Sequence, residues 1–203
     1  QSAVLEDEAA GRDLVVSAQT GSGKTVAFGL AMAPELLAGE ESLKAVREPL
    51  ALVIAPTREL ALQVSRELVW LYAKAGGRIA TCVGGMDASK ERRALSYGAH
   101  IVVGTPGRLR DHLERGALNL SSLRVAVLDE ADEMLDMGFA EEIEQILESA
   151  PAERQTALFS ATMPPPIQKL AEGYMYDPTT ISITPKELTV DAIQQAFVEV
   201  PAK

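Results

Sequence analysis

One stretch constrains this chain more than any other: residues 18–25, Ala-Gln-Thr-Gly-Ser-Gly-Lys-Thr, which lie between an apolar run at 13–17 and a helical pattern at 26–37. A buried strand, a glycine-rich turn and a helix, in that order, are typical of a phosphate-binding loop. Gly21 and Gly23 let backbone N–H groups point at phosphate oxygens, and the helix start adds its positive end. The stretch therefore predicts a nucleoside triphosphate site.

The side chains of this loop have separate expected roles. Lys24 supplies a positive charge for the β- and γ-phosphates, and Thr25 supplies a hydroxyl for Mg²⁺. The general phosphate-binding-loop pattern begins with glycine, but this chain has Ala18 at that position. From these residues alone, an ordinary serine- and glycine-rich turn therefore remains an alternative to a phosphate-binding loop. The residues expected to bind the nucleotide are Ala18, Gln19, Thr20, Gly21, Ser22, Gly23, Lys24 and Thr25.

The composition favours a single substantial core, with 203 residues of which 47% are hydrophobic. The single cysteine, Cys82, excludes an internal disulfide and fits a reducing compartment, so we expect a cytoplasmic protein. No apolar run approaches the roughly 18 residues of a membrane helix, and we expect no membrane contact. The net charge of -10 argues against a broad contact with nucleic acid, so any such contact is expected to be local.

Strands and helices alternate along the chain. In the helical pattern at 60–71, a stripe of leucine and valine with Trp70 beside it predicts core. The alternation predicts an α/β fold with a mostly parallel, doubly wound sheet that is covered on both faces. Strands are predicted at 13–17, 50–55, 79–83, 100–103, 125–128, 156–159 and around 181–183, and helices at 1–10, 26–37, 60–71, 89–95, 106–113, 143–147 and 164–174.

Polar motifs follow the predicted strands at the point where each strand ends. Such sheets bind ligands at the carboxyl ends of their strands, so one edge of the sheet is expected to be functional. Besides the phosphate-binding loop, the motifs are Pro-Thr-Arg-Glu at 56–59, Gly-Gly at 84–85, Thr-Pro-Gly-Arg at 105–108, Asp-Glu at 129–130 and Ser-Ala-Thr at 160–162.

Asp129 and Glu130 close an apolar strand, which predicts that their charges lie near the phosphate-binding loop. One carboxylate can hold the Mg²⁺ shell, which suits Asp129, and the other can orient the attacking water, which suits Glu130. The alternative is that acidic residues cap the following helix. Capping suits Asp132 but does not explain acids at both positions directly after the strand.

Together these motifs resemble the first RecA-like domain of the DEAD-box RNA helicases, in order and approximate spacing, over nearly the whole chain. Alanine at position 18 is usual in that family. The resemblance implies a RecA-like P-loop domain at 1–184, followed at 185–203 by an interdomain linker and the truncated start of a second RecA-like domain. It implies an ATP-dependent RNA helicase with ATP and Mg²⁺ as cofactors, and single-stranded or locally unwound RNA as a sequence-independent partner.

The resemblance also assigns roles to single residues. Gln1 resembles the family's adenine-reading glutamine, with an ordinary helix-start glutamine as the alternative. For Arg58 and Arg108 the alternative is surface charge at a helix start. The implied catalytic residues are Lys24, Asp129 and Glu130, the metal ligands Thr25 and Asp129, the coupling residues Asp132, Ser160 and Thr162, and the RNA contacts Thr57, Arg58, Gly85, Thr105, Gly107 and Arg108.

The family's second domain, with its arginine finger, and its adenine-stacking aromatic residue have no counterpart in this sequence, which starts at Gln1 without an initiator Met. We therefore expect a monomeric fragment that is nearly inactive alone. Two other hypotheses are a DNA helicase or translocase with a related core, which the Asp-Glu-Ala-Asp and Pro-Thr-Arg-Glu-Leu combination disfavours, and a non-catalytic ATP-binding or scaffolding module.

Overall fold

The structure, a computed structural model, describes residues 11–19 and 23–183. The predicted helix at 1–10, Gln1, the loop residues Thr20, Gly21 and Ser22, and the segment 185–203 lie outside the described residues. The strands are β1 (Leu14–Ala18), β2 (Ala51–Ile54), β3 (Ile79–Cys82), β4 (Ile101–Gly104), β5 (Val125–Leu128), β6 (Gln155–Ser160) and β7 (Thr179–Ile183). The helices are α1 (Lys24–Leu37), α2 (Arg58–Leu71), α3 (Ala88–Ser96), α4 (Pro106–Glu114), α5 (Ala131–Asp136), α6 (Ala140–Glu148) and α7 (Pro165–Tyr174).

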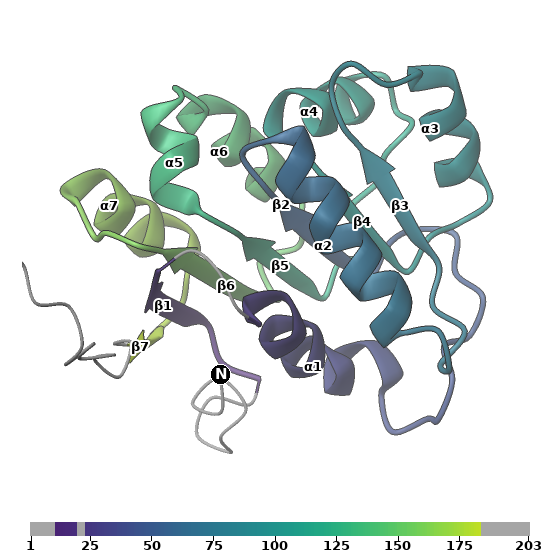
Figure 1. Ribbon diagram of the computed structural model, residues 1–203, viewed down its shortest axis with the longest axis horizontal. Helices are drawn as coiled ribbons and strands as arrows, with labels where there is room; N and C mark the ends of the chain where they lie inside the picture. The colour runs from purple at the N-terminus through teal and green to yellow at the C-terminus, as the bar shows by residue number, and fades with distance from the viewer. Residues whose placement is uncertain (1–10, 20–22, 184–203) are drawn as a thin grey trace, which may run out of the picture.

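The strands of the described chain form one seven-stranded sheet in the order β3-β4-β2-β5-β6-β1-β7 (Figure 1). Each recorded strand pair is parallel, and in the register Val16 of β1 lies opposite Phe159 of β6 and Ile181 of β7. The α/β fold with a doubly wound parallel sheet is therefore confirmed. Because parallel strands are buried on both faces, β2, β4 and β5 are buried at each position, as their continuous apolar sequences predict.

Two hydrophobic cores flank the sheet, because successive side chains of a strand point to opposite faces. Val53 packs into the core beneath α1 and α2, and its neighbour Leu52 packs into the core beneath α3 to α7. Figure 1 shows α1 and α2 on the near face of the sheet. No helix in the described part of the chain is long and apolar enough to cross a lipid bilayer.

Helix α2 shows how the sequence sets its own boundaries and packing. Thr57 caps the helix, since its hydroxyl oxygen accepts a hydrogen bond from the Leu60 N–H at 3.2 Å. Val64 and Leu68 are fully buried, as the stripe predicts. The prediction was wrong for Trp70, which is 70% exposed, because it stands about 200° around the helix from Leu68.

Helices α1 and α2 pack closely through a glycine. A Cβ added at Gly29 would lie 2.6 Å from the Cδ2 atom of Leu71, so only glycine fits there without movement of the neighbour. The buried Tyr72 hydroxyl donates a hydrogen bond to the Gly29 carbonyl and so ties the end of α2 to the middle of α1. This contact holds α1, the helix that follows the phosphate-binding loop, against the core.

Candidate functional site

The strand order divides the carboxyl edge of the sheet into two halves. Strands β5, β6 and β1 are neighbours, so the Asp-Glu motif, the Ser-Ala-Thr motif and the phosphate-binding loop follow adjacent strands. Strands β3, β4 and β2 are also neighbours, and they precede the Gly-Gly, Thr-Pro-Gly-Arg and Pro-Thr-Arg-Glu motifs. Motifs that are far apart in the sequence therefore lie in two groups on this edge: a nucleotide half at β5, β6 and β1, and a second half at β3, β4 and β2.

The described part of the phosphate-binding loop lies at the junction of β1 and α1. Gly23 precedes the helix with a φ of 81°, a left-handed conformation that favours glycine. Thr25 is buried at 8% exposure, Ala18 is buried at the end of β1, and Gln19 is exposed. No side chain of the described chain caps this end of α1, which leaves its first N–H groups for a ligand.

Lys24 and Asp129 form a direct ion pair across the nucleotide half of the edge. The Lys24 Nζ atom lies 2.9 Å from the Asp129 Oδ1 atom, and the side chains are 13% and 1% exposed. The structure thus brings together the predicted phosphate-binding lysine and the predicted metal-binding carboxylate. Asp129 and the buried hydroxyl of Thr25 are the hard oxygen donors that Mg²⁺ prefers, so these residues fit that ion.

Glu130 follows in a conformation that is unusual for a residue other than glycine, with φ 50° and ψ 52°. The pKa of its carboxyl group is raised to about 7: burial is the largest cause, a hydrogen bond with Glu133 and the charge of Asp129 add to it, and Lys24 opposes them. A cavity of about 130 Å³ lies beside these groups. Its lining residues are Ala18, Lys24, Glu130, Asp132, Glu133, Asp136 and Ala161.

The predicted coupling residues meet between α5 and the end of β6. Asp132 accepts hydrogen bonds from the Thr162 N–H at 3.1 Å and from the Thr162 hydroxyl at 2.9 Å. The Ser160 hydroxyl donates to the Thr162 carbonyl at 2.6 Å and so closes the turn. Burial raises the pKa of Asp132, but hydrogen bonds from Thr162 and from the backbone outweigh this effect and lower it below its usual range.

The other half of the edge brings together the predicted RNA contacts. The Gly84 N–H donates to the Thr105 hydroxyl oxygen at 3.4 Å. Gly85 has a φ of 79°, and a Cβ at this position would lie 3.2 Å from the Nη1 atom of Arg58. Gly107 is exposed at the start of α4, with open space where a side chain would stand. The three loops therefore form one continuous surface with exposed backbone.

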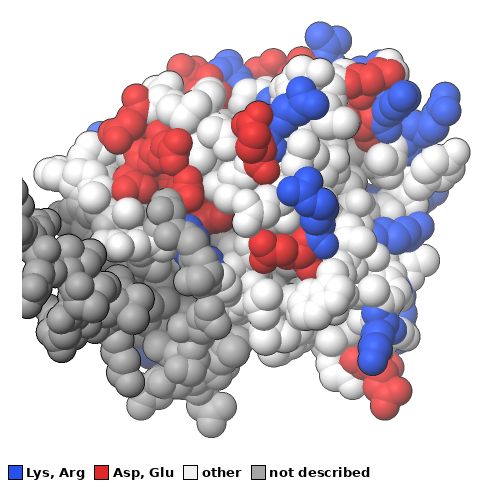
Figure 2. Space-filling view, in the orientation of Figure 1, with Lys and Arg blue, Asp and Glu red and all other residues white. Residues whose placement is uncertain are grey.

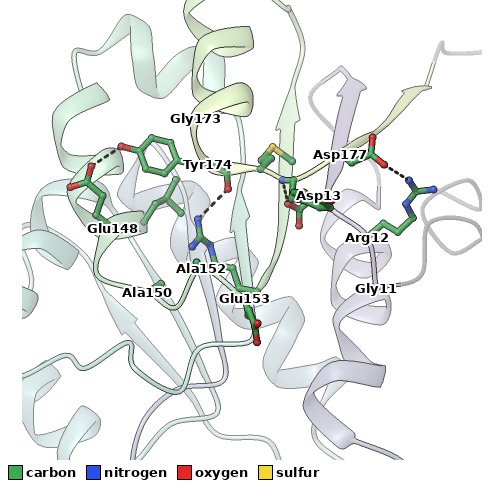
Figure 3. A pocket seen from close by; sticks show the side chains of 14 residues that line it. Gly11, Arg12, Asp13, Glu148, Ala150, Ala152, Glu153, Gly173, Tyr174 and Asp177 are labelled. Atoms are coloured by element: carbon green, nitrogen blue, oxygen red, sulfur yellow. Dashed lines mark hydrogen bonds and ion pairs between the residues drawn. The ribbon is translucent and has the colours of Figure 1, made fainter.

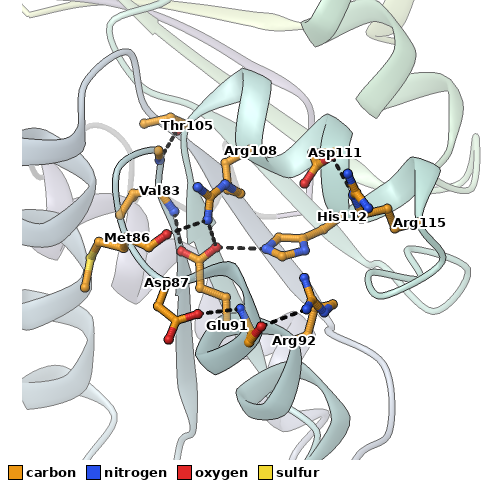
Figure 4. Close-up of polar contacts among 12 residues, drawn as sticks. Val83, Met86, Asp87, Glu91, Arg92, Thr105, Arg108, Asp111, His112 and Arg115 are labelled. Atoms are coloured by element: carbon orange, nitrogen blue, oxygen red, sulfur yellow. Dashed lines mark hydrogen bonds and ion pairs between the residues drawn. The ribbon is translucent and has the colours of Figure 1, made fainter.

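Arg108 belongs to the same loops but points inward. Its Nη1 atom donates to Glu91 Oε1 at 2.7 Å and to the Met86 carbonyl at 3.0 Å (Figure 4). The sequence did not predict that Glu91 is buried, because the neighbouring Lys90, Arg92 and Arg93 are typical of a solvent-exposed basic helix. It also missed His112, which is fully buried and bonds to Glu91 at 2.8 Å.

A larger cavity of about 970 Å³ lies at the opposite edge of the sheet, before β1 and β6 (Figure 3). Its buried acid, Asp13, accepts hydrogen bonds from the Thr156 N–H at 2.7 Å and the Tyr176 N–H at 2.6 Å. Arg154 donates to the carbonyls of Pro151 and Tyr174. These polar groups join chain segments by hydrogen bonds, and among the described residues no member of the sequence motifs lines this cavity.

Together, the parallel sheet, the glycine-rich turn before α1 and the acidic pair after β5 define a P-loop domain of the RecA-like class. A model of the DEAD/DEAH box helicase family matches residues 1–170. The chain therefore belongs to the DEAD/DEAH box helicase family.

Proteins similar to this chain include two bacterial relatives. The DEAD-box ATP-dependent RNA helicase CshA of Geobacillus kaustophilus is 48% identical over 192 residues, covering 95% of this chain and 40% of that protein. The ATP-dependent RNA helicase CshA of Listeria monocytogenes is 50% identical over 193 residues, covering 95% of this chain and 36% of that protein. The chain thus spans about two fifths of the length of these relatives.

A solved structure shares the fold. The crystal structure of a DEAD box protein from the hyperthermophile Methanococcus jannaschii superimposes with a TM-score of 0.76 at 41% sequence identity. The match covers 84% of this chain and 45% of that chain.

Proposed function

We propose that this chain is the ATP-binding half of an ATP-dependent RNA helicase, which couples ATP binding and hydrolysis to local RNA unwinding or remodelling of RNA–protein complexes. The observation that carries the proposal is the ion pair of Lys24 and Asp129. It lies beside Glu130 at the carboxyl edge of the sheet, where the phosphate-binding loop joins β1 to α1. A lysine and two carboxylates at that edge suit a triphosphate with its magnesium ion. The matching bacterial relatives are named as ATP-dependent RNA helicases, which supports the same assignment.

The residues divide the proposed chemistry among them. Bound Mg²⁺ would neutralise phosphate charge, and Asp129 with Thr25 would hold it. Lys24 would leave Asp129 and bind the β- and γ-phosphates, assisted by the N-terminus of α1. Glu130 would orient the attacking water and take its proton, a role for which a pKa of about 7 is suited. Gln1 would read the adenine ring.

RNA would lie across the loops that follow β2, β3 and β4. Hydroxyl groups and exposed backbone N–H groups bind phosphates without reading the base sequence. Figure 2 shows Lys and Arg side chains toward the α3 side of the molecule and Asp and Glu side chains gathered over α5. The proposed contacts are Thr57, Arg58, Gly85, Thr105 and Gly107, with the backbone of Arg108, whose guanidinium is bonded to Glu91.

Coupling of the nucleotide site to the RNA surface would involve Asp132, because its hydrogen bonds join α5, the helix after the acidic motif, to Thr162, which follows β6. We further propose that residues 185–203 begin the connection to a second RecA-like domain of the same protein. That domain would supply the arginine that stabilises the transition state, a contribution of about 10³ to 10⁵ in rate in GTPases. The free, buried thiol of Cys82 supports a cytoplasmic location.

Two measurements test this proposal on the chain itself. Calorimetry should detect weak ADP binding that exceeds GDP binding and is lost in Lys24→Ala. Steady-state phosphate release should be near background with or without RNA, and a covalently joined second domain should restore a rate that Glu130→Gln abolishes. Equal ADP and GDP affinity would remove the role of Gln1, and absence of any Lys24→Ala effect would leave the non-catalytic scaffold as the better hypothesis.

A further inference from the structure

Glu91 is a buried acid on an otherwise polar helix, and it lies on the RNA half of the sheet edge. Its side chain is 6% exposed, and its carboxylate accepts hydrogen bonds from three residues on two segments, the end of β3 and helix α4 (Figure 4). Oε2 accepts from the Val83 N–H at 2.9 Å. Oε1 accepts from Arg108 Nη1 at 2.7 Å and from His112 Nε2 at 2.8 Å. A carboxylate only accepts hydrogen bonds, so each partner must donate.

These hydrogen bonds fasten the Gly84–Gly85 turn at both of its ends. Val83 immediately precedes the turn and is held by Glu91 directly. Met86 follows the turn, and its carbonyl accepts from the same Arg108 nitrogen that bonds to Glu91. The Gly84 N–H also donates to the hydroxyl oxygen of Thr105, the residue that immediately precedes α4. The turn after β3 and the start of α4 are thereby joined through a single carboxylate.

A metal ion is the competing explanation for this cluster. Ligand atoms of Cys82, Glu91 and His112 all lie within 4.8 Å of one another. However, the cluster already contains a cation, since the Arg108 Nη1 atom lies 2.7 Å from Glu91 Oε1. The Glu91 oxygen that faces His112 is already bonded to the guanidinium of Arg108. The geometry therefore favours Arg108 as the cation of this cluster.

We propose that Glu91 is a positioning residue for RNA binding: together with Arg108 it holds the Gly84–Gly85 turn and the start of α4 in one preformed surface. This inference rests on the proposed function, because it concerns the surface assigned to RNA. A preformed surface binds more tightly because the loops need not be ordered when the ligand arrives. Glu91 thus raises RNA affinity although its own charge repels phosphate.

The variant Glu91→Gln separates position from charge. Glutamine keeps the shape but replaces one oxygen by an NH₂ group, which must face either the Val83 N–H or the Arg108 and His112 donors. One buried donor then loses its acceptor, and the turn is released. A purely electrostatic effect has the opposite sign, since removal of a negative charge near a polyanion strengthens binding.

The test is an NMR titration of the chain with a single-stranded oligonucleotide at low salt, with ADP binding measured in parallel. We expect Glu91→Gln to weaken RNA binding about fivefold, which corresponds to about 1 kcal/mol, and to leave ADP affinity unchanged. The matched control is Glu114→Gln on α4, the same charge change at a side chain that is 60% exposed. It should leave RNA binding equal or slightly stronger.

A second pair of variants covers the case in which Glu91→Gln does not fold. Arg108→Gln should weaken RNA binding with an unchanged salt slope, whereas loss of one phosphate contact lowers the slope by about 0.7. Arg110→Gln, with an exposed ion pair to Glu114 on the same helix, is its matched control and should have no such effect. In the double variant Glu91→Gln/Arg108→Gln the losses should not add, because the two residues act as a unit.

The outcomes separate this inference from the proposed function. Failure of the unsubstituted chain to bind RNA at all would overturn the proposed function. RNA binding by Glu91→Gln that equals or exceeds that of the unsubstituted chain would overturn the positioning role alone. Additive losses in the double variant, or a smaller salt slope in Arg108→Gln, would overturn the joint action of the two residues.

Discussion

The Lys24 Nζ atom lies 2.9 Å from the Asp129 Oδ1 atom, so the lysine proposed to bind phosphate is held by the carboxylate proposed to bind the metal. The residues are 105 positions apart in the sequence and meet because β1 and β5 both flank β6. A buried ion pair is costly to break by removal of one partner. Nucleotide binding must therefore compete with this contact before Lys24 can reach a phosphate.

The first prediction concerns Asp129→Asn, which keeps the shape of the side chain and removes its charge. With EDTA present, ADP should bind roughly tenfold more tightly than to the unsubstituted chain, because Lys24 is released and one negative charge is removed. Added magnesium should no longer increase the affinity of the variant. Calorimetry with ADP in EDTA and in magnesium chloride measures both effects.

Asp136→Asn is the matched control for that prediction. Asp136 lines the same small cavity as Lys24 but is exposed, and it has no recorded ion pair with the lysine. Its substitution changes the charge near the site equally and leaves the Lys24 contact intact. An equal gain in ADP affinity from Asp136→Asn would show that general electrostatics, and not release of Lys24, is responsible.

A second prediction concerns Thr162→Val, which keeps the size of the side chain and removes the hydroxyl that donates to Asp132. The free energy of unfolding should fall by about 1 kcal/mol, the usual net value of one hydrogen bond. The pKa of Asp132 should rise toward its ordinary range, because a hydrogen bond that lowers it is lost. Urea unfolding and NMR titration of the carboxyl group measure these changes.

The sign of the pH dependence follows from the lowered pKa of Asp132 in the folded chain. Such a carboxyl group stabilises the fold above its ordinary pKa, and the contribution is lost as the pH falls through the folded value. Thr162→Val should therefore weaken the acid-side loss of stability. Thr180→Val, at an exposed position of β7, is the control and should change neither quantity.

The central elements of the fold could be predicted from the sequence because β2, β4 and β5 are buried on both faces and are therefore continuously apolar. Residues 125–128 illustrate this, since the predicted and observed strands are identical. Trp70 could not be placed correctly from its apolar character alone, because its side of the helix decides whether it packs into the core. The order of the strands also required the structure.

The nucleotide half of the site was largely predictable, because its motifs are short and follow strands directly. The proximity of Lys24 and Asp129 is confirmed, but their direct ion pair is a tertiary contact that no local pattern indicates. The left-handed backbone conformation of Glu130 could not be predicted either, since a sequence indicates that conformation only at glycine or asparagine. Glu91 was missed because the composition of α3 predicts solvent exposure.

A third prediction compares two glycines with positive φ angles, Gly98 and Gly116. A Cβ at Gly98 (φ 82°) would lie 1.9 Å from the Val46 carbonyl oxygen, whereas Gly116 (φ 69°) has open space at the same position. Gly98→Ala should lower the free energy of unfolding by about 3 kcal/mol or more, from backbone strain and overpacking together. Gly116→Ala should cost about 1 kcal/mol from strain alone. Equal costs by urea unfolding would contradict the role of the Val46 contact.

The last prediction concerns the buried thiol of Cys82, whose pKa rises from 9.0 to about 12. Burial is the largest cause, the charge of Glu91 adds to it, and Arg108 opposes it. In the folded chain the thiol should resist alkylation at pH 8, because the reactive thiolate is not formed and the sulfur is inaccessible. Unfolding in urea should restore the reactivity that an ordinary cysteine has.

The same thiol should make the fold less stable in alkali. The unfolded chain ionises at about pH 9 while the folded chain keeps its proton to about pH 12, so stability is lost as the pH rises between these values. The slope approaches about 1.4 kcal/mol per pH unit for one such group. Cys82→Ala should be less stable at pH 7 through lost packing, yet its stability should fall less between pH 9 and pH 10 by about 1 kcal/mol. Parallel pH profiles of the two chains, measured by urea unfolding, would show that Cys82 does not carry this effect.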